Sequence, residues 1–308
     1  MLANFLNKSK PINFAGLLVF FYLTFVGELL ALFFDTPFSL EKALNIVTFI
    51  ILFVVIFFLV NFIILKHDLT YDNSYAFFFF ITLTIILLPD LLEINTLILG
   101  IIYFLFLRKI YSLRSNKRVI EKVFDAGLWL GVFFILEPIS ILFFLLLILA
   151  IYIHKKLNIN TLIIPLLGFL TPCFIYFTYL FWFDRQQEFY SLFNFKIASS
   201  IGITETKLAI PFTVVTLFTL FCFVIKSSKV FPINNTFRRS WTLILINFLL
   251  AIVFVIITPL NSYDSFMYLL FPTSLILANG IEMIKKNSFK NAIIYIFLFG
   301  SLISLILL

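Results

Sequence analysis

The positively charged residues of this 308-residue chain are distributed unevenly around a series of long apolar segments. When these segments are threaded back and forth through a membrane, eighteen of the 22 Lys and Arg residues fall on one side. Ten of the 15 Asp and Glu residues fall on the other. Because cytoplasmic loops of membrane proteins are enriched in Lys and Arg, this distribution predicts an oriented, polytopic membrane protein.

Eleven apolar segments are expected to be membrane helices, since about 20 apolar residues cross a bilayer. Hydrophobic residues make up 63% of the chain and charged residues 12%, which is not the composition of a soluble domain. No loop is long enough to fold alone, so residues 1–308 are predicted to form one all-α integral membrane domain. The expected segments are residues 12–34, 43–65, 74–89, 95–107, 124–136, 138–153, 161–182, 209–225, 240–258, 266–283 and 291–308.

An odd number of crossings places the N-terminus inside and the C-terminus outside, and the charges agree at every inside loop. The inside cations are Lys8, Lys10, Lys66, Arg108, Lys109, Arg114, Lys117, Arg118, Lys122, Lys155, Lys156, Lys226, Lys229, Arg238, Arg239, Lys285, Lys286 and Lys290. The outside cations are Lys42, Arg185, Lys196 and Lys207. The outside acids are Glu28, Asp35, Glu41, Asp90, Glu93, Glu137, Asp184, Glu188, Glu205 and Asp264.

Other features of the composition have structural explanations. The net charge of +7 is not a nucleic-acid signal, because the basic residues flank apolar segments. Residues 12–34 exceed the length of a signal-peptide core and are expected to be a retained first span. Cys173 and Cys222 are expected to be small core residues, and His67 and His154 solvated loop residues. The 45 Phe residues fit either an AT-rich genome or a Phe-lined lipid channel.

Four predicted segments, residues 74–89, 95–107, 124–136 and 138–153, look short for a bilayer. Thirteen residues of helix cover roughly 20 Å, whereas the hydrocarbon core is about 30 Å thick. Since charges fix the inner ends, the outer ends are expected to stop below the outer surface. Irregular backbone at that depth is tolerated where it lines a water-filled cavity. The sequence therefore predicts an outward-facing acidic cavity, with a locally thinner bilayer as the alternative.

The acids near this cavity are candidate ligands. Charged groups at membrane depth usually face a cavity or a partner, and carboxylates bind divalent cations through oxygen. Asp90, Glu93, Glu137 and Asp264 are therefore candidates for binding a cation or a substrate, while the identity of any metal is unknown. As alternatives, Asp90 and Glu93 are turn residues, and Glu137 caps the helix that starts at Pro138.

Arg185, the only outer arginine, is a candidate for gripping a phosphate, or else it pairs with Asp184 or Glu188. Asp125 is expected at the start of its helix, where capping and the helix dipole favour it. Gly127 and Gly131 have the spacing of close contacts between membrane helices. No nucleotide-binding loop, nucleophile elbow or cysteine-pair metal motif is present.

Several short motifs between about Phe77 and Asp184 resemble an uncharacterised family of bacterial polytopic inner-membrane proteins, and more distantly the C-type multi-spanning glycosyltransferases. The resemblance implies a polyprenyl-phosphate sugar donor at the outer face, a catalytic acid in the first outer loop and a divalent cation nearby. Only Asp35, with Glu28 as a substitute, matches the position of that acid. The motifs are Leu88-Pro89-Asp90, Phe106-Leu107-Arg108-Lys109-Ile110-Tyr111, Phe124-Asp125-Ala126-Gly127, Leu136-Glu137-Pro138 and Leu167-Gly168-Phe169-Leu170-Thr171-Pro172.

Three functions fit these observations. The first is a glycosyltransferase-C-like protein of the bacterial inner membrane, with Asp35 or Glu28 as the base and polyprenyl phosphate as its lipid. The second is a non-catalytic subunit or scaffold of a cell-envelope assembly, bound to another membrane protein. The third is a transporter of a lipid or small solute that uses Glu28, Glu137 and Asp264 as coupling acids. Whether the protein is an enzyme is left open by the sequence.

Overall fold

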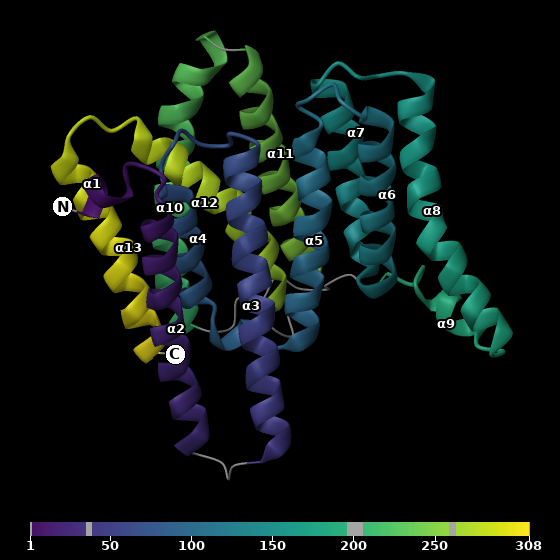
Figure 1. The fold of residues 1–308 in the computed structure, drawn as a ribbon, viewed down its shortest axis with the longest axis horizontal. Helices are drawn as coiled ribbons and strands as arrows, with labels where there is room; N and C mark the ends of the chain where they lie inside the picture. Colours follow the sequence, from purple (N-terminus) through teal and green to yellow (C-terminus); the bar gives the residue numbers. More distant parts are fainter. Residues whose placement is uncertain (1, 35–38, 196–205, 234, 259–262, 308) are drawn as a thin grey trace. The chain divides into compact units, whose positions relative to one another are not determined.

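The structure, a computed structural model, describes residues 2–34, 39–195, 206–233, 235–258 and 263–307. Within these ranges every regular element is a helix (Figure 1), as the sequence predicts. The α-helices are α1 (Leu2–Leu6), α2 (Pro11–Phe34), α3 (Leu40–Lys66), α4 (Tyr75–Ile86), α5 (Ile94–Ser112), α6 (Val119–Leu136), α7 (Phe144–Ile153), α8 (Ile159–Trp182), α9 (Gln186–Ser191), α10 (Thr206–Ile233), α11 (Asn235–Ile257), α12 (Met267–Glu282) and α13 (Asn287–Leu307). The 3-10 helices are η1 (Pro89–Leu91), η2 (Pro138–Phe143) and η3 (Tyr263–Phe266).

Seven of the helices in the described ranges are long and apolar enough to cross a membrane, which supports a membrane protein. They are Pro11–Leu29, Leu40–Lys66, Ile94–Ser112, Ile159–Trp182, Thr213–Pro232, Phe237–Ile257 and Asn287–Leu305. Each of the eleven predicted segments overlaps a helix, residues 138–153 being formed by η2 and α7 together. The number of crossings and the side on which the N-terminus lies stay predictions.

The chain divides into two compact units. The first unit comprises Met1–Leu97, Gly202–Asn235 and Ser262–Leu308, and the second comprises Ile98–Ile201 and Thr236–Asn261. One boundary falls within α5, after Leu97. That residues 1–308 act as a single membrane domain stays a prediction.

The first unit is built around two short helices, α4 and α12, which pack against each other. Every residue of α4 is buried, and α12 is buried continuously from Leu270 to Ile281. A helix that is apolar on all sides is typically buried inside a protein. α4 is such a helix apart from two threonines, Thr82 and Thr84. Their hydroxyl groups donate to Phe79 O and Phe80 O of the same helix. Helices α2, α10 and α13 contact this central pair.

Phenylalanine rings fill the interface between α2 and α3 in the first unit. The ring of Phe21 lies 4.6 Å from that of Phe57 and 4.9 Å from that of Phe53, measured between centroids. Nearer the N-terminus of α2, the rings of Phe14 and Phe58 are 5.1 Å apart. Phe21, Phe53 and Phe57 are fully buried, so these three phenylalanines are core residues.

In the second unit, α6 and α8 pack at close range through glycines. A methyl group at Gly127 would overlap the carbonyl of Pro165, and one at Gly168 would overlap the carbonyl of Phe124. A methyl group at Gly131 would overlap Phe169 O and lie 2.6 Å from Cγ of Pro172. The predicted close contact at Gly127 and Gly131 is therefore confirmed, and Gly168 supplies the matching small residue on α8.

The lengths of two segments differ from the prediction. α5 has 19 residues and α6 has 18, against the 13 predicted for each, because both helices continue past their apolar residues into the charged turns. Long basic side chains allow this, since their stems cover apolar surface while the charges stay outside. Asp125 consequently does not start its helix, which begins at Val119; it forms an ion pair with Lys109 of α5 instead. The predicted short lengths of α4 and α7 are confirmed, at 12 and 10 residues.

The histidines and cysteines are buried. His67 and His154 are 8% and 7% exposed, so the prediction of solvated histidines is wrong: each follows the last residue of a helix and donates its backbone N–H to that helix. Cys173 and Cys222 are free thiols in buried positions, as predicted.

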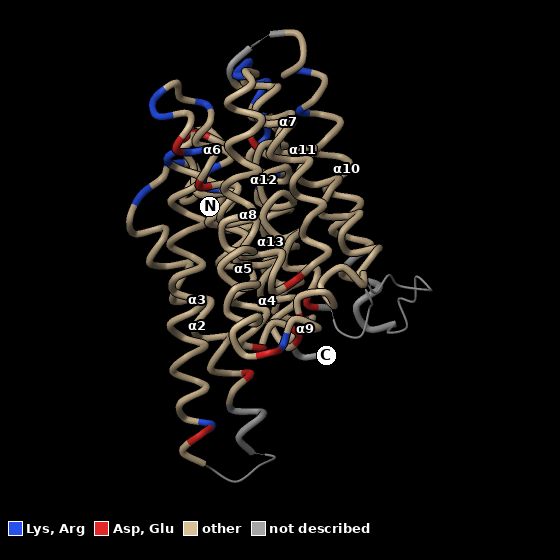
Figure 2. The backbone as a smooth tube through the Cα atoms, turned by 90° about the vertical axis from the view of Figure 1, so that its right-hand side faces the viewer, with Lys and Arg blue, Asp and Glu red and all other residues tan. Residues whose placement is uncertain are grey.

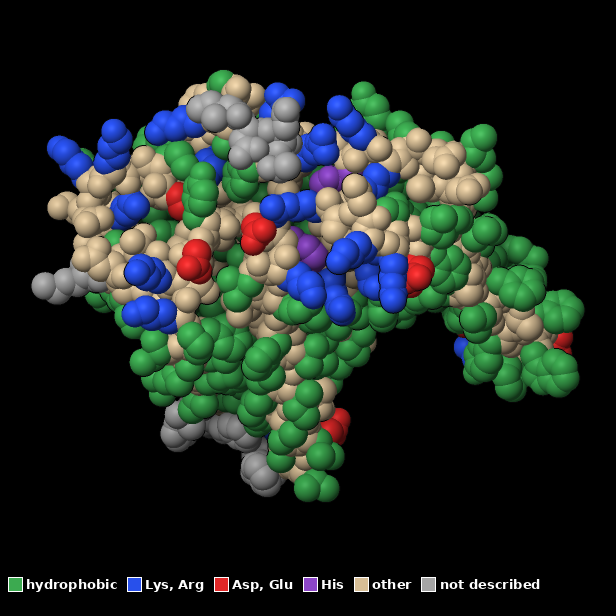
Figure 3. All heavy atoms as spheres, turned by 45° about the horizontal axis from the view of Figure 1, so that its top comes forward, with side chains coloured by type: hydrophobic (Ala, Val, Ile, Leu, Met, Phe, Trp, Pro, Cys, Tyr) green, Lys and Arg blue, Asp and Glu red, His purple; other side chains and the backbone are tan. Residues whose placement is uncertain are grey.

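Within each unit, Lys and Arg gather toward one end of the helices (Figure 2). Their side chains stand out on the surface there (Figure 3). In the first unit this end includes Lys8, Lys10 and Lys66, and we call it the inner end, after the predicted orientation. The opposite end of that unit, which includes η1 and η3, is the outer end.

Candidate functional site

At the outer end of the first unit, the two short helices that carry Asp90 and Asp264 contact each other. Asp90 lies in η1, shortly after α4, and Asp264 lies in η3, directly before α12. η1 and η3 contact each other because the central helices α4 and α12 are packed side by side. Both aspartates are half-buried.

The other predicted acids of this unit are less closely associated. Glu93 is exposed and accepts a hydrogen bond from the Thr96 hydroxyl at 3.2 Å, while Leu97 N–H donates to its backbone oxygen. It therefore acts as a turn residue at the start of α5. Glu28 is half-buried on α2. Asp35, the predicted catalytic acid, lies outside the described residues.

The central helices end well short of their neighbours. α4 has 12 residues and covers about 18 Å, whereas α2 and α3 have 24 and 27 residues. Figure 1 shows α2 and α3 extending past the level of η1. The outer end of α4 is thus set back between longer helices, the geometry that the sequence predicts for this segment.

In the second unit, Glu137 and Arg185 have mainly local partners. Glu137 ends α6 and precedes η2; its backbone N–H donates to Phe133 O and its carbonyl accepts from Ser140 N. The guanidinium of Arg185 binds the carboxylate of Glu188 through two bonds, Nε to Oε1 at 2.5 Å and Nη2 to Oε2 at 2.8 Å. Of the two possibilities for Arg185, pairing with a neighbouring acid is the one the structure contains.

A metal site built from several acids is not found in the described part of the chain. No group of three or more His, Cys, Asp or Glu side chains in those residues is close enough to hold a metal ion. A divalent cation at the outer end would therefore need Asp35 or oxygen atoms of the substrate in addition to the described carboxylates.

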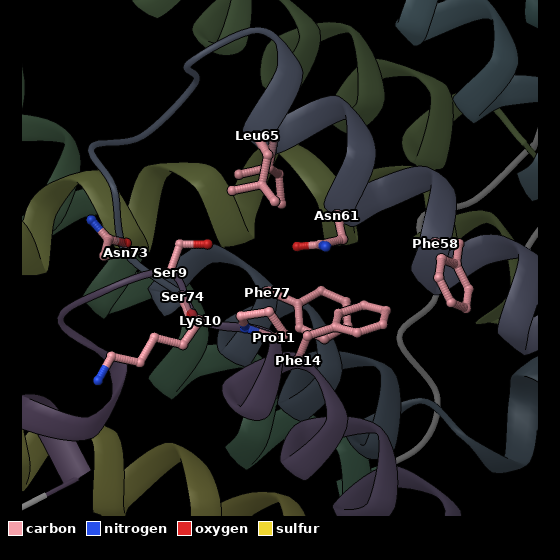
Figure 4. Close-up of a pocket in the computed structure, with 11 residues that line it drawn as sticks. Ser9, Lys10, Pro11, Phe14, Phe58, Asn61, Leu65, Asn73, Ser74 and Phe77 are labelled. Carbon is pink, nitrogen blue, oxygen red and sulfur yellow. The ribbon is translucent and has the colours of Figure 1, made fainter.

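The inner end of the first unit contains a cavity that the sequence does not predict. Its volume is about 250 Å³, and it lies where α2, α3 and α4 meet the N-terminal turn. Figure 4 shows its lining residues. They are Ser9, Lys10, Pro11, Phe14, Phe58, Asn61, Ile64, Leu65, Asn73, Ser74 and Phe77.

One wall of the cavity continues into a buried ion pair. The Asn73 amide donates to Glu282 Oε1 at 2.6 Å, and the backbone N–H of Tyr71 donates to the same oxygen at 3.1 Å. The other carboxylate oxygen of Glu282 binds Nζ of Lys226 at 3.1 Å. The Lys226 and Glu282 side chains are only 1% and 6% exposed. Such a pair stays charged inside a protein only when further hydrogen bonds satisfy it, and the 71–73 turn supplies them.

The N-terminal segment is attached to this end of the unit. The Tyr75 hydroxyl donates to Ala3 O at 2.9 Å, and Ala3 N–H donates to Asn291 Oδ1 at 2.9 Å. The buried amide of Asn13 donates to Phe5 O at 2.7 Å and Lys8 O at 2.8 Å. These bonds fix the turn that carries Ser9 and Lys10, so this side of the cavity is preorganised.

A comparison with protein-family models matches residues 1–307 to a family of unknown function, DUF6427. The chain belongs to DUF6427. No curated protein and no solved structure matches it. The family match confirms the resemblance to an uncharacterised family and does not extend it to the C-type glycosyltransferases.

Sequence reasoning missed the inner-end residues of this DUF6427 protein, although two signals point to them. Asn61 interrupts an otherwise apolar run near the end of α3, and Glu282 is an acid on the side where cations predominate. A polar group at membrane depth needs a partner. The same reasoning that singled out the outer acids would therefore have singled out Asn61 and Glu282.

Proposed function

We propose that this protein is a multi-spanning protein of the bacterial inner membrane with its N-terminus in the cytoplasm. Seven helices of spanning length support this, together with the concentration of Lys and Arg at one end of the helices within each unit. The test is the accessibility of single cysteines to a membrane-impermeant thiol reagent, after Cys173 and Cys222 are replaced by alanine. Cysteines at positions 8 and 117 should react only from the cytoplasm, and one at position 42 only from outside. The reverse labelling would reject the orientation.

We further propose that the outer end of the first unit handles a polyprenyl-phosphate-linked substrate. The observation that supports this is the contact between η1 and η3, the elements of Asp90 and Asp264, where α4 ends short of α2 and α3. Two carboxylates together with phosphate oxygens are a suitable ligand set for a divalent cation. A phosphate group bound there would lie below the level of the long helices α2 and α3.

In a glycosyl transfer at this place, Asp35 or Glu28 would take the proton of an acceptor hydroxyl. The acceptor oxygen would form a bond to the anomeric carbon while the bond from that carbon to the lipid phosphate breaks. Asp90 and Asp264 would hold the divalent cation, which would balance the charge of the leaving phosphate. Glu93, Glu137 and Arg185 remain candidates for substrate contacts outside this step.

Lipids retained by the purified protein test this proposal. We expect an isoprenoid phosphate to co-purify with the wild type and to be depleted in Asp90→Asn/Asp264→Asn. The control is Glu121→Gln, which removes an exposed acid far from η1 and η3 in the sequence. An equal lipid content in all three proteins would overturn the proposal. A stable protein partner that co-purifies without any isoprenoid phosphate would favour the scaffold hypothesis instead.

A further inference from the structure

The inner-end cavity is lined by two chemically different sets of side chains. Phe14, Phe58 and Phe77 form an aromatic wall, in which Phe14 lies 4.8 Å from Phe77 and 5.1 Å from Phe58 between ring centroids. Hydroxyl and amide groups of Ser9, Asn61, Asn73 and Ser74 also line the cavity, with Asn61 on the same helix as Phe58. A site with both apolar and hydrogen-bonding side chains suits an amphiphile at the boundary between its polar and its apolar part.

Asn61 offers an amide to a ligand of the cavity. It belongs to α3, a helix of spanning length, and Figure 4 shows its amide pointing into the cavity. The Asn61 side chain makes no hydrogen bond to any residue in the described part of the chain. The Asn61 residue is half-exposed, so a polar group that enters the cavity can reach its amide.

One cation lines the cavity, and two more are neighbours of lining residues in the sequence. Lys10 lines the cavity and is exposed, Lys8 lies two residues before Lys10, and Lys66 follows Leu65 at the end of α3. Two acids, Asp68 and Asp72, lie in the loop that leads to Asn73, and Asp72 is exposed. Basic pockets between membrane helices on the cytoplasmic side bind lipid head groups. A nearby acid is compatible with a head group that also carries an ammonium.

The size and the openings of the cavity indicate which part of a lipid it takes. Its volume of about 250 Å³ lies below the roughly 300–1,000 Å³ of pockets that enclose a whole drug-sized ligand. Phe58 and Leu65 line the cavity and are 56% and 44% exposed. The apolar part of a lipid whose polar part lies inside the cavity can therefore contact these two side chains.

We infer that this cavity binds the phosphodiester head group of a glycerophospholipid from the inner leaflet. The phosphate accepts hydrogen bonds from the Asn61 amide and the Ser9 hydroxyl, and the ammonium of Lys10 neutralises its charge. The first part of an acyl chain lies against Phe14 and Phe58. Asn73 does not bind the phosphate, because its amide is already committed to Glu282; it holds the wall in position.

The experiment measures phospholipid binding to the full chain, purified in a mild detergent and delipidated, by native mass spectrometry. The probes are phosphatidylglycerol, phosphatidylethanolamine and inorganic phosphate. The variants are Lys10→Glu, which changes an exposed residue and leaves the core intact, and Asn61→Leu, which removes the amide at similar volume. The matched controls are Lys42→Glu and Asn45→Leu, which make the same changes at the other end of α3.

We expect the wild type to retain one tightly bound phospholipid. Since hydrogen bonds to charged groups are the stronger ones, each variant should bind this lipid roughly tenfold to a hundredfold more weakly, and both controls should bind it like the wild type. A preference for phosphatidylglycerol would mean that the lysines dominate recognition, and a preference for phosphatidylethanolamine that Asp72 contributes. Unchanged binding by Lys10→Glu and Asn61→Leu would overturn the inference. So would inorganic phosphate that competes as strongly as the lipid.

Discussion

Replacing one partner of the buried Lys226–Glu282 pair should lower the stability of the first unit more than replacing both. Lys226 is 1% exposed and Glu282 6%. Glu282→Gln leaves a buried ammonium without its counter-charge, while the remaining amide oxygen still accepts from Tyr71 N and Asn73. Breaking a buried pair in this way costs about 3–5 kcal/mol. In Lys226→Met, Glu282 keeps the hydrogen bonds from Tyr71 N and the Asn73 amide. We therefore expect a smaller loss of stability, about 2 kcal/mol.

The double variant Lys226→Met/Glu282→Gln distinguishes the ion pair from general packing. Neither charge remains, and replacing a buried pair by neutral groups is often close to neutral in stability. We therefore expect the double variant to be more stable than Glu282→Gln alone. If the two single losses were independent, the double variant would be the least stable of the three, since independent effects add.

Cys222 provides a local assay for this experiment. It lies in α10, four residues before Lys226, is fully buried, and packs against Gly280 of α12. In a Cys173→Ser background, the rate at which a thiol reagent labels Cys222 reports how often α10 and α12 separate. A loss of 3–5 kcal/mol corresponds to labelling faster by about a hundredfold to several thousandfold. Equal labelling rates for wild type and Glu282→Gln would refute the assignment of a stabilising ion pair.

Three further predictions concern the second unit, and labelling of Cys173 in a Cys222→Ser background measures each. Gly168→Ala should destabilise the contact of α6 with α8 by about 1–3 kcal/mol, because the new methyl group overlaps Phe124 O. The control Gly16→Ala should have no such effect, because a methyl group at Gly16 meets no atom within 4 Å. Burial, together with Lys156, Arg239 and Arg114, lowers the pKa of His154 to about 4. An unfolded histidine has a pKa of about 6.5, so the unfolded state takes up the proton at a higher pH than the folded state does. The free energy of unfolding should therefore fall as the pH drops from about 6.5 to 4. In His154→Asn this pH-dependent loss of stability should be absent. Lys156→Ala should remove the hydrogen bonds from the lysine ammonium to the carbonyls of Leu113 and Ser115, just after α5, and lower the free energy of unfolding by about 1–3 kcal/mol. Lys155→Ala changes an exposed lysine and should leave the stability nearly unchanged.

The segments of this fold were predictable because each is specified by neighbouring residues. Apolar runs mark the helices, and the charges next to them mark the ends, so every predicted segment overlaps a helix. The spacing of Gly127 and Gly131 likewise predicts close packing without showing which helix is the partner. The start of α6 was misplaced because residues 119–123 combine charges with good helix formers, and hydropathy cannot distinguish a charged turn of helix from a loop.

The inner-end site depends instead on residues far apart in the sequence. Glu282 binds Lys226, Asn73 and Tyr71, which are 56, 209 and 211 positions away. No local pattern brings these groups together; the packing of α4, α10 and α12 does. The histidines show the same limitation, since both follow helix ends, as loop residues do, and are buried only by tertiary contacts.

Phospholipid binding and the buried ion pair are mechanically linked through Asn73. Its side chain lines the cavity, donates to Glu282 and accepts from the backbone of Tyr75 at 3.1 Å. Because the ion pair already holds Asn73 in position, a ligand that enters the cavity loses little binding free energy to ordering of the protein. Disrupting the pair by Glu282→Gln should therefore weaken lipid binding, although Glu282 does not touch the lipid. Conversely, because a ligand stabilises the folded state to which it binds, bound lipid should slow the labelling of Cys222 in the wild type. Slower labelling with phospholipid in the wild type and in Asn45→Leu, but not in Asn61→Leu, would connect the cavity to the ion pair. The same labelling rate with and without lipid in the wild type would show that the two are independent.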